Sequence, residues 1–145
     1  MKVFTSYFGN ISALKNEGIE CFSIARYSPR WYTGHRLTWL APSSYMLSDN
    51  CSREEYIKMY KEICNRVNVE SLMKQLEKIG NGADVALLCY ERPGDFCHRH
   101  LLAEYLNSKG CDIKEFNAFE YRSEKQSQIV EQEEQQTPEQ LSLFD

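Results

Sequence analysis

The stretch from Asp84 to Leu106 limits the possible folds of this 145-residue chain more than any other. It begins with the apolar run Val85-Ala86-Leu87-Leu88, with Asn-Gly before it and Pro-Gly after it, which predicts a strand buried on both faces. From Cys97 the apolar residues recur at helical spacing, and Gly110 predicts a left-handed stop. A buried strand that leads directly into a helix is typical of an α/β sheet.

The flanking sequence supplies the other elements of such a sheet. Residues 2–7 and 19–25 have strand composition, and a short helix fits between them, from Asn10 to Lys15. Amphipathic helices follow Ser52, which forms a capping box with Glu55, and Asn68; residues 113–119 predict a fourth strand. We therefore predict one α/β domain over residues 1–122, three-layered and Rossmann-like, with a small, mainly parallel sheet in strand order 2-1-3-4.

Residues 123–145 differ in composition from the rest of the chain. They are polar, acidic and rich in Gln, which predicts a disordered tail. This tail carries a net charge of −5, whereas residues 1–122 carry +1. The overall charge of −4 therefore does not exclude a polyanionic ligand on the domain.

The sequence also suggests a compartment. No window approaches the roughly 18 apolar residues that span a bilayer, and the N-terminus lacks the apolar core of a signal peptide. We predict a cytoplasmic protein without a membrane partner. Its six cysteines are scattered through the predicted strands and helices, so we expect them to be reduced, and most of them to be small core residues.

Reactive side chains gather between the predicted strand and the predicted helix. A helix N-terminus carries partial positive charge, so Cys97, flanked by His98 and Arg99, is expected to have a lowered thiol pKa. The same features could instead hold a phosphate. Glu91 offers a carboxylate for proton transfer or for attack on a sugar carbon. Glu91 and Cys97 are the predicted catalytic residues, on a rim rather than in the core.

A long irregular segment, residues 26–50, also follows a predicted strand. Its planar cations and aromatic rings suit base stacking and phosphate neutralisation. Because the carboxyl ends of parallel strands meet at one edge, this segment should face the Cys97 loop. The alternative is a surface loop whose tryptophans pack back on the domain. The predicted substrate- and phosphate-binding residues are Arg26, Arg30, Trp31, Tyr32, His98 and Arg99.

A metal site is a weaker interpretation of the same residues. Cys89, Cys97, His98 and His100 have ligand side chains. Adjacent residues in a helix diverge, however, whereas zinc-binding pairs usually have two or more residues between the ligands. No glycine-rich dinucleotide or phosphate-loop motif is present, so no cofactor is predicted.

A family resemblance rests on this same stretch. The pattern Leu-Cys-x-Glu-x-Pro, followed by Cys-His-Arg-x-x-Leu-Ala-x-x-Leu, resembles the hallmark of the domain of unknown function 488 family. It is carried by Leu88, Cys89, Glu91, Pro93, Cys97, His98, Arg99, Leu102, Ala103 and Leu106. Residues 26–32 resemble the aromatic insertion of phage and bacterial members. The resemblance covers residues 1–120 and implies a Rossmann-like cytosolic domain of unsettled activity.

The C-terminus has a second resemblance. Gln140-Leu141-Ser142-Leu143-Phe144 is similar to the peptide by which bacterial polymerases and repair proteins dock on the replicative sliding clamp. Gln140 offers amide hydrogen bonds, and Leu141, Leu143 and Phe144 can fill hydrophobic pockets. We expect the sliding clamp as a partner, unless these residues fold back on the domain.

Together these features predict a nucleotide- or nucleic-acid-processing protein of phage or bacterial origin. It would act on DNA bases or on nucleotides, as a hydrolase or transferase, while tethered to the clamp. Two alternatives remain open: a non-catalytic module that binds nucleotides or nucleic acid, and a metal-binding Cys/His protein.

Overall fold

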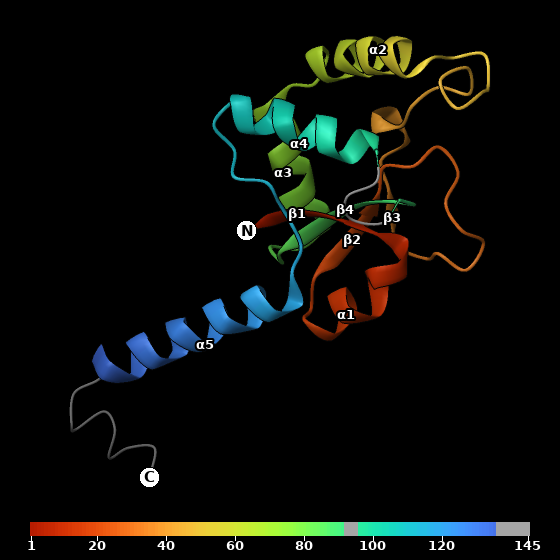
Figure 1. Cartoon of the computed structure of the whole chain (residues 1–145). Coiled ribbons are helices and arrows are strands. Elements are labelled where there is room, and N and C mark those ends of the chain that lie inside the picture. Colours follow the sequence, from red (N-terminus) through yellow and green to blue (C-terminus); the bar gives the residue numbers. More distant parts are fainter. Residues whose placement is uncertain (92–95, 136–145) are drawn as a thin grey trace.

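A parallel sheet between two layers of helices forms the core of the fold in a computed structural model, which describes residues 1–91 and 96–135 (Figure 1). The strands are β1 (Val3–Tyr7), β2 (Glu20–Ser23), β3 (His35–Arg36), β4 (Val85–Cys89) and β5 (Lys114–Glu115). The α-helices are α1 (Ile11–Asn16), α2 (Arg53–Asn65), α3 (Val69–Ile79), α4 (His98–Ser108) and α5 (Ala118–Gln135). Short 3-10 turns cover Phe8–Asn10 and Thr38–Leu40.

Strand β4 lies at the centre of the sheet, whose order is β3-β2-β4-β1-β5 with every pair parallel. The parallel α/β class is confirmed, but the predicted strand order is wrong because it placed β1 between β2 and β4. All five residues of β4 are buried, so this strand needs neighbours on both sides and cover on both faces. That requirement outweighs the tendency of consecutive strands to be adjacent. The two-residue strand β3 was not predicted.

The two faces of the sheet pack into separate cores. Val85 and Leu87 contribute to the core beneath α2, α3 and α4, whereas Ala86 and Leu88 contribute to the core on the α1 side. This alternation is the two-residue period of a strand. Figure 1 shows α2, α3 and α4 on one side of the sheet and α1 on the other, as predicted for three layers.

The predicted caps of α2 and α3 are present, whereas Asn10 at the start of α1 makes no capping hydrogen bond with its side chain. The Ser52 hydroxyl accepts a hydrogen bond from the Glu55 amide at 3.1 Å, and the Asn68 side chain accepts one from the Ser71 amide at 3.0 Å. Gly110, with φ of +96°, follows α4 in the left-handed conformation that ends a helix. No helix among the described residues is both long and apolar enough to cross a bilayer.

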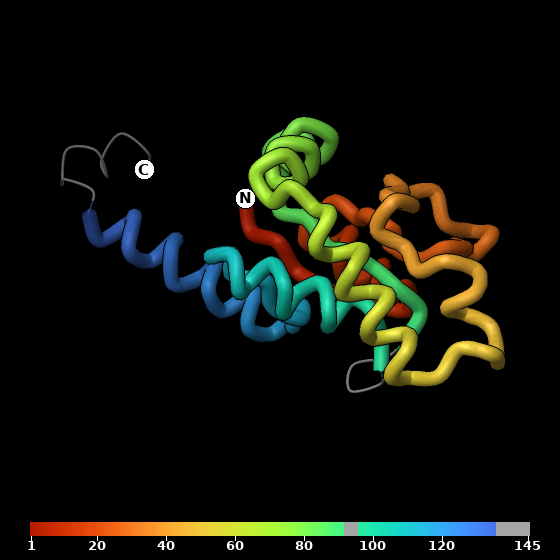
Figure 2. Tube along the Cα trace, turned by 90° about the horizontal axis from the view of Figure 1, so that it is seen from above, coloured from red at the N-terminus to blue at the C-terminus, as the bar shows by residue number. Residues whose placement is uncertain are grey.

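Helix α5 corrects the prediction that disorder begins at Ser123, because residues 118–135 form one continuous helix. Its first turns dock on the domain: Tyr121 is buried and donates a hydrogen bond to Asp84 at 2.7 Å, and Lys2 pairs with Glu124 at 2.6 Å. Beyond Tyr121 its residues are exposed, and the helix projects from the sheet (Figure 2). Glu, Gln and Lys favour helix even without packing. The same residues are typical of disordered segments, so the composition of this region did not predict the helix. The predicted clamp-binding residues lie outside the described residues.

Candidate functional site

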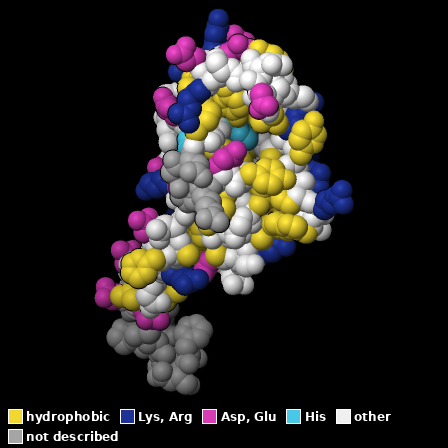
Figure 3. All heavy atoms as spheres, turned by 45° about the vertical axis from the view of Figure 1, so that its right-hand side comes forward, with side chains coloured by type: hydrophobic (Ala, Val, Ile, Leu, Met, Phe, Trp, Pro, Cys, Tyr) yellow, Lys and Arg dark blue, Asp and Glu magenta, His cyan; other side chains and the backbone are white. Residues whose placement is uncertain are grey.

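Three loops meet at the carboxyl edge of the sheet, as predicted. They follow β1 at Phe8, β2 at Arg26 and β4 at Tyr90, and residues from all three line neighbouring cavities. Figure 3 brings this side of the molecule forward and shows hydrophobic side chains gathered there, with basic side chains at the margin. The edge therefore combines apolar contact surface with positive charge.

The larger of the two cavities at this edge is an open hollow of about 560 Å³, which we call the aromatic hollow. Phe8 is buried at its floor, with ring centroids 4.9 Å from Tyr90 and 6.4 Å from Trp31, both edge to face. Trp31 and Tyr90 are 58% and 51% exposed, so their rings are available to a ligand. The lining residues are Tyr7, Phe8, Gly9, Pro29, Trp31 and Tyr90.

A small cavity of about 100 Å³ shares Tyr90 with the aromatic hollow. Glu91 lines it and is exposed, as the predicted rim position requires. Burial, followed by the negative charge of Glu91, raises the pKa of the Tyr56 phenol, which therefore stays protonated near that carboxylate. The lining residues are Ala25, Arg26, Tyr27, Pro42, Leu47, Tyr56, Cys89, Tyr90, Glu91 and His98.

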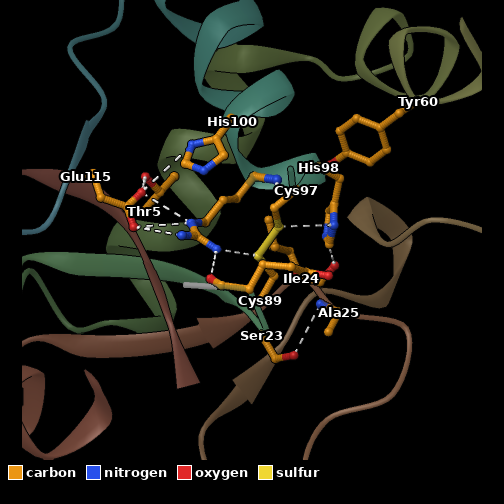
Figure 4. Close-up of a disulfide and its surroundings, with 12 residues drawn as sticks. Thr5, Ser23, Ile24, Ala25, Tyr60, Cys89, Cys97, His98, His100 and Glu115 are labelled. Atoms are coloured by element: carbon orange, nitrogen blue, oxygen red, sulfur yellow. Dashed lines mark hydrogen bonds and ion pairs between the residues drawn. A yellow bond between two sulfur atoms is a disulfide. The ribbon is translucent and has the colours of Figure 1, made fainter. Parts of the chain in front are cut away.

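Cys97 lies at the start of α4 but not on a rim. It is the N-cap residue, and its Sγ accepts a hydrogen bond from the Arg99 amide at 3.5 Å, which is the expected helix-end environment. Its exposure is only 2%, and a disulfide joins it to Cys89 (Figure 4). The predictions of a rim thiolate and of fully reduced cysteines are therefore wrong for this pair. Cys21, Cys51, Cys64 and Cys111 are free.

Arg99 also lies in the core, with an exposure of 0%. Its Nε donates to the carboxylate of Glu115 at 3.2 Å, and its Nη2 lies 3.1 Å from the same group. Its Nη1 donates to Cys89 Sγ at 2.9 Å and to the Glu91 carbonyl oxygen. The predicted rim position of Arg99 is wrong, because its guanidinium is buried and bonded to protein groups; its contact with phosphate stays a prediction that this burial disfavours. Glu115 was missed, since no local pattern relates it to α4.

His98 is buried and neutral. Its Nε2 lies 2.7 Å from the Ile24 carbonyl oxygen, to which only a protonated nitrogen can donate, so its Nδ1 carries no proton. Burial lowers the pKa of His98 to about 4. A buried, uncharged imidazole attracts phosphate weakly, so the structure disfavours the predicted phosphate contact of His98, which stays a prediction.

The structure brings together three of the four residues of the metal interpretation. The ligand atoms of Cys89, Cys97 and His98 all lie within 4.8 Å of one another. The expectation that neighbouring ligands diverge is wrong for Cys97 and His98, because Cys97 has extended backbone angles as N-cap and its side chain leaves the helical period. His100 lies outside this group, with Nδ1 4.0 Å from Glu115.

The remaining predicted residues divide by burial. Arg26, Arg30 and Trp31 are exposed at the edge. Tyr32 is only 3% exposed, and its hydroxyl donates to the backbone carbonyls of Cys21 at 3.0 Å and His35 at 2.7 Å. Tyr32 is thus a core residue, and its burial disfavours the predicted substrate contact, which stays a prediction.

Sequence reasoning also missed residues of the two cavities. Tyr7 ends the first predicted strand, Phe8 follows it and Tyr90 follows the third predicted strand, so the sequence already placed them at the carboxyl edge. Tyr56 belongs to a helical core stripe, and only the tertiary structure shows that its ring borders Glu91.

Of the comparisons with known proteins, the family comparison agrees with the resemblance that the sequence from Leu88 to Leu106 shows. No curated protein and no solved structure matches the chain. The family model DUF488-N3a, described as the active DUF488-N3 subclade, matches residues 11–110. That span covers more than half of the chain and includes the β4 to α4 motif, the loop with Trp31 and the residues of both cavities from Ile11 onward. The chain therefore belongs to the DUF488 family.

Proposed function

We propose that this protein binds a base of a nucleotide or nucleic acid in the aromatic hollow. Glu91 would then carry out chemistry on the bound nucleoside. The proposal depends on one observation: exposed Trp31 and Tyr90 border a hollow that adjoins the cavity of Glu91, at the carboxyl edge of a parallel sheet. Open α/β sheets bind their ligands at this edge.

The hollow suits a planar ligand. Stacking of a base on an aromatic side chain contributes about 1–3 kcal/mol, and every base offers a face for it. Phe8 supports both Trp31 and Tyr90 by edge-to-face contacts, which limits the rotamer freedom that binding must remove. Exposed Arg26 and Arg30 supply positive charge for a phosphate.

Glu91 is the leading candidate for chemistry. Its carboxylate is exposed, whereas the Cys97 sulfur is buried and bonded to Cys89. A carboxylate beside a bound nucleoside can act as a general base or attack the sugar carbon. Burial and the charge of Glu91 raise the pKa of the nearby Tyr56 phenol, so this group can donate a hydrogen bond to the carboxylate or the substrate but is a poor general acid. The reaction class is hydrolysis or group transfer at a nucleoside.

Tryptophan fluorescence provides the binding test. The chain has two tryptophans, so Trp39→Phe leaves Trp31 as the single reporter. Titration of this variant with single-stranded oligonucleotides, and separately with mononucleotides, should give saturable quenching with at least one of them. The matched control is Trp31→Phe, whose remaining Trp39 should show no saturable change. Equal responses in the two variants, or no response to either ligand class, would contradict base binding in the hollow.

A second experiment separates an enzyme from a binding module. The wild-type chain and Glu91→Gln are incubated with the ligand that binds, and released bases or sugars are separated by chromatography. An enzyme should release product in the wild type only, while both proteins bind equally in the fluorescence assay. Equal binding without product in either protein would favour the non-catalytic module.

The clamp tether is a further part of the proposal, supported by the resemblance of Gln140, Leu141, Leu143 and Phe144 to clamp-binding peptides. Helix α5 would act as a semi-rigid spacer of about 27 Å, from 18 residues rising about 1.5 Å each. A labelled peptide of residues 136–145 should bind a bacterial sliding clamp with micromolar affinity, or about −8 kcal/mol. The control peptide with Leu143→Ala and Phe144→Ala should not bind; equal binding would remove the partner.

A further inference from the structure

We propose that Cys89, Cys97 and His98, with both thiols reduced, form a binding site for one Zn²⁺ ion. The proposal is independent of base binding in the aromatic hollow. It assigns a use to a buried cluster whose three residues do not line the hollow.

The first argument is the convergence of three ligand atoms from two elements. Cys89 ends β4, while Cys97 and His98 begin α4, and their two sulfurs and one ring nitrogen lie within 4.8 Å of one another. Two thiolates and one imidazole are soft and borderline ligands of the kind that zinc prefers. The converging side chains are visible in Figure 4.

The second argument is the orientation of the histidine. Donation from Nε2 to the Ile24 carbonyl leaves the Nδ1 lone pair free, and this atom lies 3.7 Å from Cys97 Sγ. Zinc-binding histidines characteristically donate their other ring N–H to a backbone carbonyl or carboxylate, which fixes the tautomer and the ring. The structure already provides this arrangement for His98.

The third argument is the set of donors that face the sulfurs. Cys89 Sγ accepts from Arg99 Nη1 at 2.9 Å, and Cys97 Sγ accepts from the Arg99 amide at 3.5 Å. Such donors stabilise thiolates. The positive charge of Arg99 is matched by Glu115, and two thiolates neutralise a divalent cation, so the loaded site buries no net charge.

The spacing of the two cysteines also fits a shared ion. Their Cα atoms are 7.5 Å apart, whereas disulfide-bonded cysteines usually have Cα atoms about 4.4–6.8 Å apart. Two Zn–S bonds of about 2.3 Å at a tetrahedral angle place the sulfurs about 3.8 Å apart, which requires a wider spacing than a disulfide.

Three protein ligands leave a fourth position on the ion. Cys89 and His98 both line the small cavity that contains Glu91, and its volume of about 100 Å³ is enough for a water molecule. Zinc sites with three protein ligands and an open fourth position are typically catalytic, whereas structural sites are closed by four. The proposed ion would therefore face the same cavity as Glu91.

Loading the site from the disulfide form requires a reductant. A phosphine or dithiol supplies two electrons, the S–S bond breaks, and each sulfur takes one proton from water. Zinc then binds as the two thiol protons are released. Oxidised protein, in which the sulfurs are bonded to each other, should not bind the ion at this site.

Cobalt titration tests the proposal, because thiolate-bound Co²⁺ absorbs strongly through charge transfer. The full chain is reduced with a phosphine, freed of metal and titrated anaerobically with Co²⁺, followed by Zn²⁺. We expect one equivalent of Co²⁺ with thiolate charge transfer, which one equivalent of Zn²⁺ removes. The absorption should be lost in Cys97→Ser and in His98→Gln and retained in Cys111→Ser and His100→Gln.

A second measurement does not depend on whether the variants fold. In reduced wild-type protein, one equivalent of Zn²⁺ should protect Cys89 and Cys97 from alkylation under mildly denaturing conditions, while the labelling of Cys51 and Cys111 is unchanged. Absence of charge transfer together with absence of protection would overturn the proposal. So would cobalt absorption that persists in the double variant Cys89→Ser/Cys97→Ser.

Discussion

The cluster of Cys89, Cys97, His98 and Arg99 and the aromatic hollow meet where β4 ends, yet the cluster is buried and the hollow is exposed. In the cluster, Arg99 is paired with Glu115, and His98 is hydrogen-bonded to the Ile24 carbonyl oxygen. In the hollow, half or more of the Trp31 and Tyr90 surfaces remain exposed. The comparison teaches that a polar motif at a helix start can be buried as an internal support, while Tyr90, the residue after Cys89, is exposed in the aromatic hollow.

The largest expected effect tests whether the cluster is a support. Arg99→Ala should lower the free energy of unfolding by about 3–5 kcal/mol, because Glu115 loses its buried partner and the Arg99 stem leaves a void. Urea unfolding followed by circular dichroism measures this value. The matched control Arg30→Ala removes an exposed guanidinium and should change stability by less than about 0.5 kcal/mol. If Arg99→Ala is as stable as the wild type but no longer releases product, Arg99 is not a structural support and the predicted substrate contact is favoured.

The next effect concerns pH. Burial lowers the pKa of folded His98 to about 4, whereas an unfolded histidine titrates near 6.5. Between these values the unfolded state binds more protons, so the contribution of His98 is complete above pH 6.5 and is lost as pH falls toward 4. The loss should approach about 3 kcal/mol. Urea unfolding of the reduced, metal-free protein at several pH values measures it.

The variant His98→Gln supplies the control for that measurement. Its amide can still donate to Ile24 but does not titrate, so the slope between pH 6.5 and 4 should flatten. Parallel slopes in wild type and His98→Gln would show that the imidazole is not held neutral in the core.

The sequence predicted the parts of this comparison that local patterns determine. Short-range patterns predict the apolar run of β4 and the caps at Ser52 and Asn68. The shared edge of the loops then follows from the parallel direction of the strands. Exposure within the motif does not follow, since Arg99 is buried by Glu115, which lies 16 residues away in β5. The central place of β4 is likewise a property of the whole sheet. Contacts between residues far apart in the sequence therefore determine both the strand order and the burial of Arg99.

A moderate effect is expected at the hollow. Trp31→Ala should weaken binding of a base-containing ligand by about 1–3 kcal/mol, the usual contribution of one stacked ring. Folding stability should change much less, because Trp31 is 58% exposed. Competition against a fluorescent oligonucleotide measures the affinity, and Trp39→Ala, outside the hollow, is the control. Equal loss in both variants would show that the hollow has no special role.

The smallest expected effect distinguishes a polymeric ligand from a free nucleotide. Arg26 and Arg30 are exposed on the loop that borders the two cavities, and each can contact a phosphate. For single-stranded nucleic acid, each phosphate contact contributes about 0.7 to the slope of log affinity against log salt concentration. Replacement of either arginine by Gln should therefore reduce that slope by about 0.7 and weaken binding by less than about 1 kcal/mol at moderate salt.

The comparison variant for this measurement is Lys58→Gln, which removes an exposed charge from α2 and should leave the slope unchanged. Fluorescence titrations at several salt concentrations give the slopes. If the chain binds a nucleoside monophosphate instead, the two arginines can contact only one phosphate group between them, and the losses in the two variants should not be additive. Additive losses in Arg26→Gln and Arg30→Gln would instead indicate a strand that passes both residues, with its base in the hollow between Trp31 and Tyr90.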